Sequence, residues 1–145
     1  MRAMRRLTKL RRRGGNLEVL LLDGDEEHEV VGESQYQDAL ERLVGGKSKR
    51  SAQVETVGVL APEPENPHDP NAVAVLISGL AVGYLPRGVA LTLSARIQRA
   101  MRREGKPIAV RAVIVGGWLR DGGDEGSFGV RLYFDPRDST LGGPA

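Results

Sequence analysis

Apolar and polar residues alternate in several short stretches of the chain, which is the pattern of half-buried β-strands. These stretches lie at residues 57–61, 73–77, 108–114 and 128–134, and two shorter β-like stretches at 17–22 and 29–31 come first in the chain. Short strands that follow one another so closely favour a barrel or a closely folded sheet. The turn sequence Asp23-Gly24-Asp25 separates the first two stretches and predicts a hairpin or a tight corner between them.

Two segments change to a helical period. Ser34 and Gln37 form a capping-box pattern that predicts a helix over residues 36–44, ended by Gly45-Gly46. A longer helix is predicted over residues 87–104, because apolar residues recur there at helical spacing and Gly105 follows. Its other face carries the arginines that form either a solvated face or a phosphate contact: Arg96, Arg99, Arg102 and Arg103. We therefore expect a mainly β fold with two helices.

The length and composition predict one domain that folds without a disulfide or a metal. The chain has 145 residues and no cysteine, which excludes disulfides and thiolate zinc sites. It has no apolar run of the roughly 18–20 residues that span a membrane, and no signal-peptide pattern, so we expect a soluble cytoplasmic protein. The domain is predicted at residues 16–136, between a basic flexible arm at 1–15 and a flexible tail at 137–145.

The formal net charge of +2 conceals a strong asymmetry along the chain. The first thirteen residues hold seven bases and no acid, residues 14–41 hold nine acids and no base, and residues 84–120 hold eight bases and one acid. A surface polarised in this way attracts a polyanion on one side only. The basic arm is either a solubilising tail or a nucleic-acid contact.

No residue pattern marks this chain as an enzyme. His28 follows an acidic turn and His68 precedes Asp69, but neither spacing matches a metal site, so no metal and no cofactor is expected. No Gly-x-Ser-x-Gly nucleophile motif occurs. A metal-dependent hydrolase that uses His28 and His68 is the least favoured alternative.

The most informative stretch is the loop of residues 62–72. Pro64, Pro67 and Pro70 each fix their own φ and push the preceding residue toward extended geometry, so the loop is stiff. It also carries short polar side chains that can bond to the main chain: Asn66, Asp69 and Asn71. A rigid polar loop that leads into a strand can present a binding site, and the alternative is that Asp69 and Asn71 only hold the loop together.

Three motifs in order resemble the HIRAN domain family. They are Val30-Val31-Gly32 with the following Tyr36, then Asn66-Pro67-His68-Asp69-Pro70-Asn71-Ala72-Val73-Ala74-Val75, then Val82-Gly83-Tyr84-Leu85-Pro86-Arg87. The family occurs at the N-terminus of remodelling ATPases and as a small bacterial module. The resemblance implies a modified OB-like β-barrel of the HIRAN type that binds single-stranded DNA at free 3′ ends, in DNA repair or replication-fork processing, without catalysis.

The resemblance also implies a DNA-binding pocket. Carried over residue by residue, this pocket falls on Tyr36, Asn66, His68, Asp69, Tyr84 and Arg87. Asp69 would accept the terminal 3′-hydroxyl, an aromatic ring would stack on the last base, and Arg87 would lie near a phosphate. The expected partners are single-stranded DNA or DNA 3′ ends and a helicase or nuclease protein. The alternative function is a non-catalytic protein-interaction or regulatory domain on the same barrel.

Overall fold

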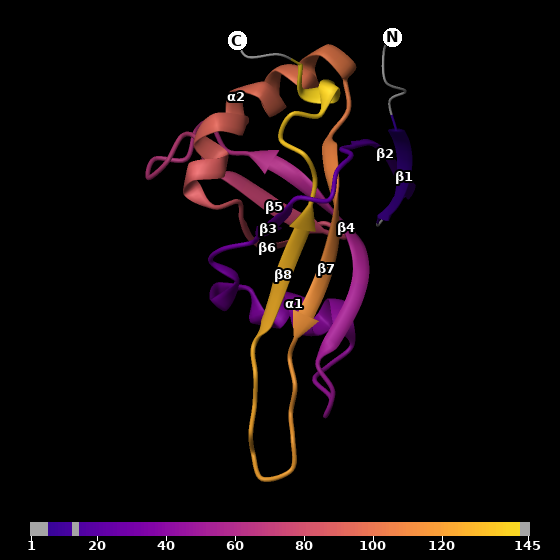
Figure 1. The fold of residues 1–145 in the computed structure, drawn as a ribbon, viewed down its shortest axis with the longest axis vertical. Helices are drawn as coiled ribbons and strands as arrows, with labels where there is room; N and C mark the ends of the chain where they lie inside the picture. The colour runs from indigo at the N-terminus through magenta and orange to yellow at the C-terminus, as the bar shows by residue number, and fades with distance from the viewer. Residues whose placement is uncertain (1–5, 13–14, 143–145) are drawn as a thin grey trace.

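The computed structural model describes residues 6–12 and 15–142, and it is mainly β with two helices, as the sequence predicts (Figure 1). The strands are β1 (Arg6–Arg12), β2 (Gly15–Leu21), β3 (Glu27–Glu29), β4 (Ala52–Pro62), β5 (Val73–Ile77), β6 (Leu80–Tyr84), β7 (Ile108–Gly116) and β8 (Phe128–Tyr133). The helices are α1 (Gln37–Val44) and α2 (Arg87–Glu104), with short 3-10 turns η1 (Glu33–Gln35) and η2 (Ser139–Leu141).

All eight strands belong to one strongly curled sheet. Its order is β1-β2-β7-β4-β5-β6, and β8 pairs with both β7 and β3. Neighbours are antiparallel except for β2 and β7, which run parallel. The curl brings the end of β3 to β6, where Val31 and Tyr84 exchange two backbone hydrogen bonds of 2.9 Å. This bridge completes a barrel-like ring of β7, β4, β5, β6, β3 and β8.

Gly83 makes the closing bridge possible. Its φ of +146° suits glycine, and a Cβ at this position would lie 2.4 Å from Val30 Cγ1 and 2.6 Å from the Val31 carbonyl oxygen. Any side chain would therefore push apart the two segments that the bridge joins.

The core fills the inside of the curled sheet and the space beneath α2. Alternate residues of β7 and β8 are buried, as period-2 patterning requires. Ala90, Leu93, Ile97 and Ala100 form the buried stripe of α2. This helix has the predicted bounds and ends at Gly105, whose φ is +65° and whose N–H donates to the Met101 carbonyl at 2.8 Å. Each fully buried aliphatic side chain contributes roughly 1.5–3 kcal/mol.

The predicted capping box of the first helix is wrong. Ser34 lies in η1, and α1 begins at Gln37 with no side-chain cap. The Gln37 amide instead pairs with the backbone of Phe128, donating to its carbonyl at 2.9 Å and accepting from its N–H at 2.8 Å. The Gln37 side chain thus forms the hydrogen bonds that a neighbouring strand would form with β8. This contact joins residues far apart in sequence, so the local pattern does not contain it.

The turn Asp23-Gly24-Asp25 forms a tight corner and not a hairpin. This is the second of the two structures that its sequence predicts. β2 pairs with β1 and β7, whereas β3 pairs with β8. The corner is held to the end of the chain, because the Asp23 N–H donates to Asp138 Oδ2 at 2.6 Å and the Asp135 N–H donates to the Asp23 carbonyl at 2.7 Å.

Both ends of the described chain contact the body of the fold. Residues 6–12 of the expected flexible arm form β1, which pairs along its length with β2. In the expected flexible tail, Leu141 is buried, and Arg96 and Arg103 of α2 donate to the carbonyls of Gly142 and Thr140 at 2.9 and 2.6 Å. These two arginines therefore hold the C-terminal segment instead of forming a solvated face or a phosphate contact. Described residues on both sides of the predicted bounds of 16 and 136 therefore contact partners that are distant in sequence.

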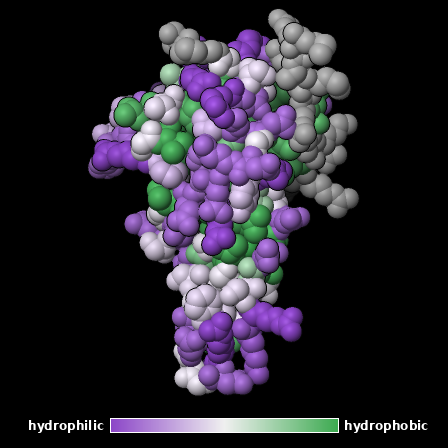
Figure 2. Space-filling model, in the orientation of Figure 1, coloured by the Kyte–Doolittle hydropathy of each residue, from purple (hydrophilic) through white to green (hydrophobic). Residues whose placement is uncertain are grey.

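The loop between β7 and β8 projects from the body and is covered by hydrophilic residues (Figures 1 and 2). Its charges pair with one another or with the segment after α1: Lys47 pairs with Glu125, Lys49 with Asp121 at 3.0 Å and Arg120 with Asp124 at 3.1 Å. Within the described ranges 6–12 and 15–142, no helix is long and apolar enough to cross a membrane.

Candidate functional site

A surface cavity of about 300 Å³ lies beside the bridge that closes the barrel. The end of β3, the loop after β4, the end of β6 and the start of α2 meet there. Its lining residues are Val31, Gly32, Asn66, Asp69, Ala72, Tyr84, Leu85, Arg87 and Ala90. Four of the six residues predicted from sequence therefore share one cavity, which we call the seam cavity: Asn66, Asp69, Tyr84 and Arg87.

The loop between β4 and β5 is organised by the Asn66 side chain. Its Oδ1 accepts from the N–H groups of His68 at 2.9 Å and Asp69 at 3.2 Å, while Nδ2 donates to Glu63 Oε1 at 3.1 Å. The Asp69 carbonyl accepts from the Ala72 N–H at 3.0 Å. Together with the three prolines, these bonds give the loop one defined shape at the wall of the seam cavity.

The two carboxylate oxygens of Asp69 have different surroundings. Oδ1 accepts from the Asn71 N–H at 2.9 Å, so Asp69 does hold its own loop together, as one of the sequence interpretations proposed. Oδ2 lies 3.7 Å from Arg87 Nε, which is beyond hydrogen-bond distance. The Asp69 side chain is 24% exposed and that of Arg87 is 83% exposed. The carboxylate therefore retains acceptor capacity toward the cavity while its other oxygen stabilises the loop.

Tyr84 is the aromatic residue of the seam cavity, and its hydroxyl is fixed as a donor. It donates to Glu63 Oε1 at 3.1 Å. Burial, followed by the hydrogen bond and the negative charge of Glu63 and then the neighbouring Tyr36, raises the pKa of Tyr84 to about 12. The phenol therefore stays protonated to a higher pH than an ordinary tyrosine, and it donates this proton to Glu63.

Glu63 is the residue that sequence reasoning missed. Its Oε1 receives both the Tyr84 hydroxyl and the Asn66 amide, so one carboxylate joins the end of β6 to the loop. The only signal for it in the sequence is an acid three residues before Asn66, within reach of an amide in a turn. That spacing is too common to single out a residue before the fold is known.

The other two predicted residues lie next to the seam cavity but do not line it. His68 is exposed and lines a shallow neighbouring depression formed by residues 63–68 of the same loop. Tyr36 precedes α1, and it is one of the smaller causes of the raised pKa of Tyr84. Val31, a residue of the closing bridge, lines the seam cavity and is 43% exposed, so it offers an apolar contact there.

The histidines do not join a metal-ligand cluster among residues 6–12 and 15–142, where no group of three or more suitable side chains occurs. The His28 ring stacks on Phe134 with centroids 4.3 Å apart, and its Nε2 lies 3.0 Å from Glu26 Oε2.

A curled β sheet that carries a stiff polar loop at a surface cavity has the architecture of a small binding module. The family model of the HIRAN domain matches residues 29–111, which is more than half of the chain and includes all six predicted site residues. This protein belongs to the HIRAN domain family. Among solved structures it is similar to the crystal structure of the HIRAN domain of human HLTF, with 19% identity, 79% of this chain and 78% of that chain covered, and a TM-score of 0.36. No curated protein matches the chain.

Proposed function

We propose that this domain is a non-catalytic nucleic-acid-binding module that receives the free 3′ end of single-stranded DNA in the seam cavity, in DNA repair or replication-fork processing. The observation that carries the proposal is that the two carboxylate oxygens of Asp69 have different surroundings. One oxygen maintains the loop, and the other faces a solvent-accessible cavity with a cation nearby. Membership of the HIRAN family supports nucleic acid as the ligand class.

A terminal hydroxyl suits the polar side of the seam cavity. The Asp69 carboxylate is an acceptor only, and a 3′-hydroxyl brings the donor that it lacks. Hydrogen bonds to a charged group contribute roughly 1.5–3 kcal/mol. Arg87, exposed at the start of α2, can pair with the last phosphate of the strand, and guanidinium groups suit phosphate well.

The remaining walls suit a nucleobase. Val31, Ala72, Leu85 and the Tyr84 residue supply apolar contact area around the polar group. Stacking or packing of a base on such a surface tolerates different sequences, because every base has a π face. The cavity therefore supports recognition of a strand end and not of a particular base.

The same cavity should reject a 3′-phosphate. Asp69 lines the cavity and Glu63 accepts hydrogen bonds from two of its other lining residues, so a phosphate at the strand end would add negative charge near these carboxylates while removing the donor proton. Like-charge contacts in a partly buried site cost affinity and give specificity. We therefore expect strands with a free 3′ end to bind at least about tenfold better than 3′-phosphorylated strands, which corresponds to about 1.4 kcal/mol.

The test is a titration of labelled single strands that differ only in their 3′ group, repeated with Asp69→Asn. This substitution removes the charge but keeps an oxygen that can accept from the Asn71 N–H, so the loop should stay folded. The tenfold preference should shrink to about threefold or less, with little change in melting temperature. The matched control is Glu65→Gln, which removes an exposed charge from the same loop and should leave the preference intact.

Absence of any end preference in the parent protein would contradict the proposal. The salt dependence identifies the ligand class independently, because neutralised phosphates give a linear fall of log affinity with log salt. Binding of a protein at the seam cavity in place of DNA would support the interaction-domain alternative instead.

A further inference from the structure

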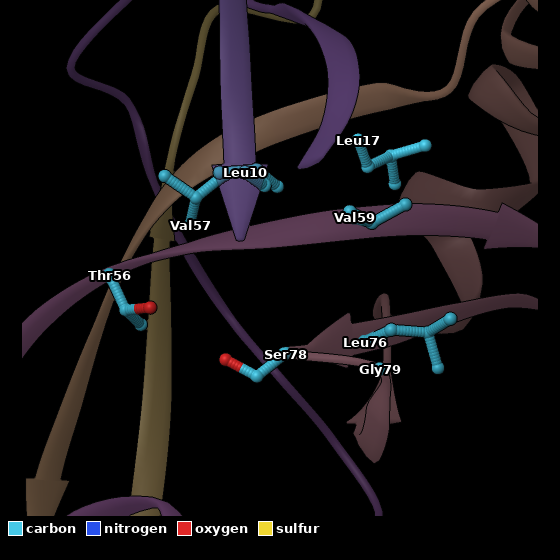
Figure 3. A pocket seen from close by; sticks show the side chains of 8 residues that line it. All are labelled: Leu10, Leu17, Thr56, Val57, Val59, Leu76, Ser78 and Gly79. Atoms are coloured by element: carbon cyan, nitrogen blue, oxygen red, sulfur yellow. The ribbon is translucent and has the colours of Figure 1, made fainter. Parts of the chain in front are cut away.

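A second depression, of about 390 Å³, lies on the outer surface of the sheet under the β1–β2 hairpin (Figure 3). Its lining residues are Leu10, Leu17, Thr56, Val57, Val59, Leu76, Ser78 and Gly79. Leu10 of β1 and Leu17 of β2 lie over β4, while Leu76 and the turn after β5 form the opposite side (Figure 3). We call this depression the aliphatic groove, since its lining holds five aliphatic side chains, two hydroxyl side chains and a glycine.

Core packing alone does not account for the groove. Gly58 and Leu60 of β4 are buried, whereas Val57 and Val59 alternate with them, line the outside of the sheet and are half-buried. Outward positions of an antiparallel sheet usually carry polar residues. Leu7 of β1 is also apolar and is 56% exposed. The outward side chains of Val57, Val59 and Leu76 are therefore apolar at the place where they line the groove.

The strand above the groove is an edge of the sheet and is strongly basic. β1 stands at the end of the strand order and carries four bases and no acid. Its register places Lys9 opposite Glu18 but places Arg6, Arg11 and Arg12 opposite the uncharged Leu21, Asn16 and Gly15. An edge strand offers unpaired backbone groups to another chain, and the charged residues in the sequence of this one are all basic.

We propose that the aliphatic groove and the β1 edge together dock an extended acidic peptide segment of a protein partner. Aliphatic side chains of the segment enter the groove, its backbone pairs with β1, and its carboxylates balance the arginines of this strand. Addition of a strand to an exposed sheet edge is a common mode of peptide recognition, in which the backbone gives affinity and side-chain pockets give specificity. The proposal is independent of the seam cavity, because the loop after β4 and β1 lie on opposite sides in Figure 1.

The lining favours a peptide over a nucleic acid. Single strands without sequence preference bind where bases stack on aromatic rings, and the groove lining holds no aromatic residue. Its aliphatic walls match Val, Leu or Ile side chains, whose burial needs no polar partner. The arginines make an acidic segment preferable to a basic one of the same apolar pattern.

The test uses a fluorescently labelled peptide in which Glu or Asp alternates with Val or Leu, and a second peptide of the same apolar pattern with Lys or Arg at every acidic position. The full chain should bind the acidic peptide at least about tenfold more tightly than the basic one. Leu76→Glu, which places a negative charge in the groove, should weaken acidic-peptide binding by about tenfold or more. Val54→Ser is the matched control, since Val54 is an exposed valine of β4 outside the groove lining.

Two further measurements keep the result independent of folding. The double variant Arg11→Glu/Arg12→Glu reverses two charges in the sequence of the edge strand and should also weaken binding by at least about tenfold. Amide chemical shifts on titration should move at Leu10, Val57 and Leu76 and stay constant at Asp69. Equal binding of the two peptides, or peptide-induced shifts confined to the seam cavity, would overturn the proposal. It would also be overturned if an oligothymidylate occupied the groove in place of the peptide, or if the chain dimerised through the groove.

Discussion

The seam cavity and the aliphatic groove both lie on the surface of one curled sheet, but they are built by opposite means. In the seam cavity, Asn66, Glu63 and Tyr84 are connected by hydrogen bonds of 3.1 Å that fix where each polar atom lies. In the groove, Leu10, Leu17 and Val59 create only an apolar surface. Hydrogen bonds are directional and hydrophobic contact is not. The comparison teaches that the cavity can discriminate between chemical groups, whereas the groove discriminates by shape, area and nearby charge.

The difference extends to how much each region depends on the barrel. The seam cavity borders the single bridge between Val31 and Tyr84, so its walls move if the ring opens. The groove lies where β1 and β2 cross β4, and β4 pairs along nine residues with β7. Changes at the seam should therefore affect the cavity before they affect the groove.

The largest effect is expected from Gly83→Ala. The new Cβ would lie 2.4 Å from Val30 Cγ1, in a backbone conformation with φ of +146°. We expect a loss of about 3 kcal/mol in the free energy of unfolding and a fall of roughly 10 °C in melting temperature, with loss of 3′-end binding. Acidic-peptide binding should persist in the folded fraction.

The control for Gly83→Ala is Gly122→Ala. Gly122 also has a positive φ, of +87°, but a Cβ there meets nothing within 4 Å. It should cost only about 1 kcal/mol. Equal losses for the two variants, measured by chemical denaturation, would show that the close approach at the seam contributes nothing.

A smaller effect is expected from Asn66→Ala, compared with Asn71→Ala. The first removes two acceptor contacts to the loop backbone and one donor contact to Glu63, so it should cost about 2 kcal/mol and lower the affinity for 3′ ends. The second should change stability by less than about 0.5 kcal/mol, because the bond from Asn71 to Asp69 uses its backbone N–H. Denaturation and oligonucleotide titration of both variants measure this difference, and peptide binding at the groove should be the same in both.

The smallest effect is expected from Tyr84→Phe, and it depends on pH. The folded-state pKa of about 12 is above the ordinary value of 10.0, so the unfolded chain loses the phenolic proton first as pH rises. The stabilising contribution of this hydroxyl is therefore complete below pH 10 and is lost between pH 10 and 12. The stability difference between the parent and Tyr84→Phe should shrink over that window when unfolding is measured at each pH.

A surface hydroxyl provides the comparison for Tyr84. Tyr133 of β8 donates to Glu27 Oε1 of β3 at 3.1 Å, and neither residue is part of the seam cavity lining. Tyr133→Phe should leave the 3′-end preference unchanged, whereas Tyr84→Phe should reduce it by freeing Glu63. A parent-like pH profile in Tyr84→Phe would contradict the role assigned to the Tyr84 phenol.

Several elements were predictable because their signals are local. The α2 pattern contains its apolar stripe and its terminating glycine in one continuous segment, and the structure has the predicted bounds. The strands β5, β7 and β8 lie where the alternating stretches predicted them. The loop with Asn66 and Asp69 could be recognised as stiff because proline and short polar side chains act on their nearest neighbours.

Other features could not be predicted because they depend on partners distant in sequence. β1 looked like a charged tail, and only its pairing with β2 makes it a strand. Arg96 and Arg103 looked like a solvated or phosphate-binding face, and only the docked C-terminal segment supplies the carbonyls that they bind. The sequence places the Gln37 side chain in a capping box, and only the structure shows that it hydrogen-bonds to the backbone of Phe128.

The sequence by itself thus determined the β-rich class, the long helix, the stiff loop and, through three motifs, the HIRAN resemblance. The tertiary structure decided that Asn66, Asp69, Tyr84 and Arg87 share one cavity, that Glu63 joins them, and that β1 covers an aliphatic groove. The physical reason is the range of the interactions. Backbone propensity and hydrophobic periodicity act over one or two turns of chain, whereas a cavity is defined by side chains that meet only after the sheet has curled and closed.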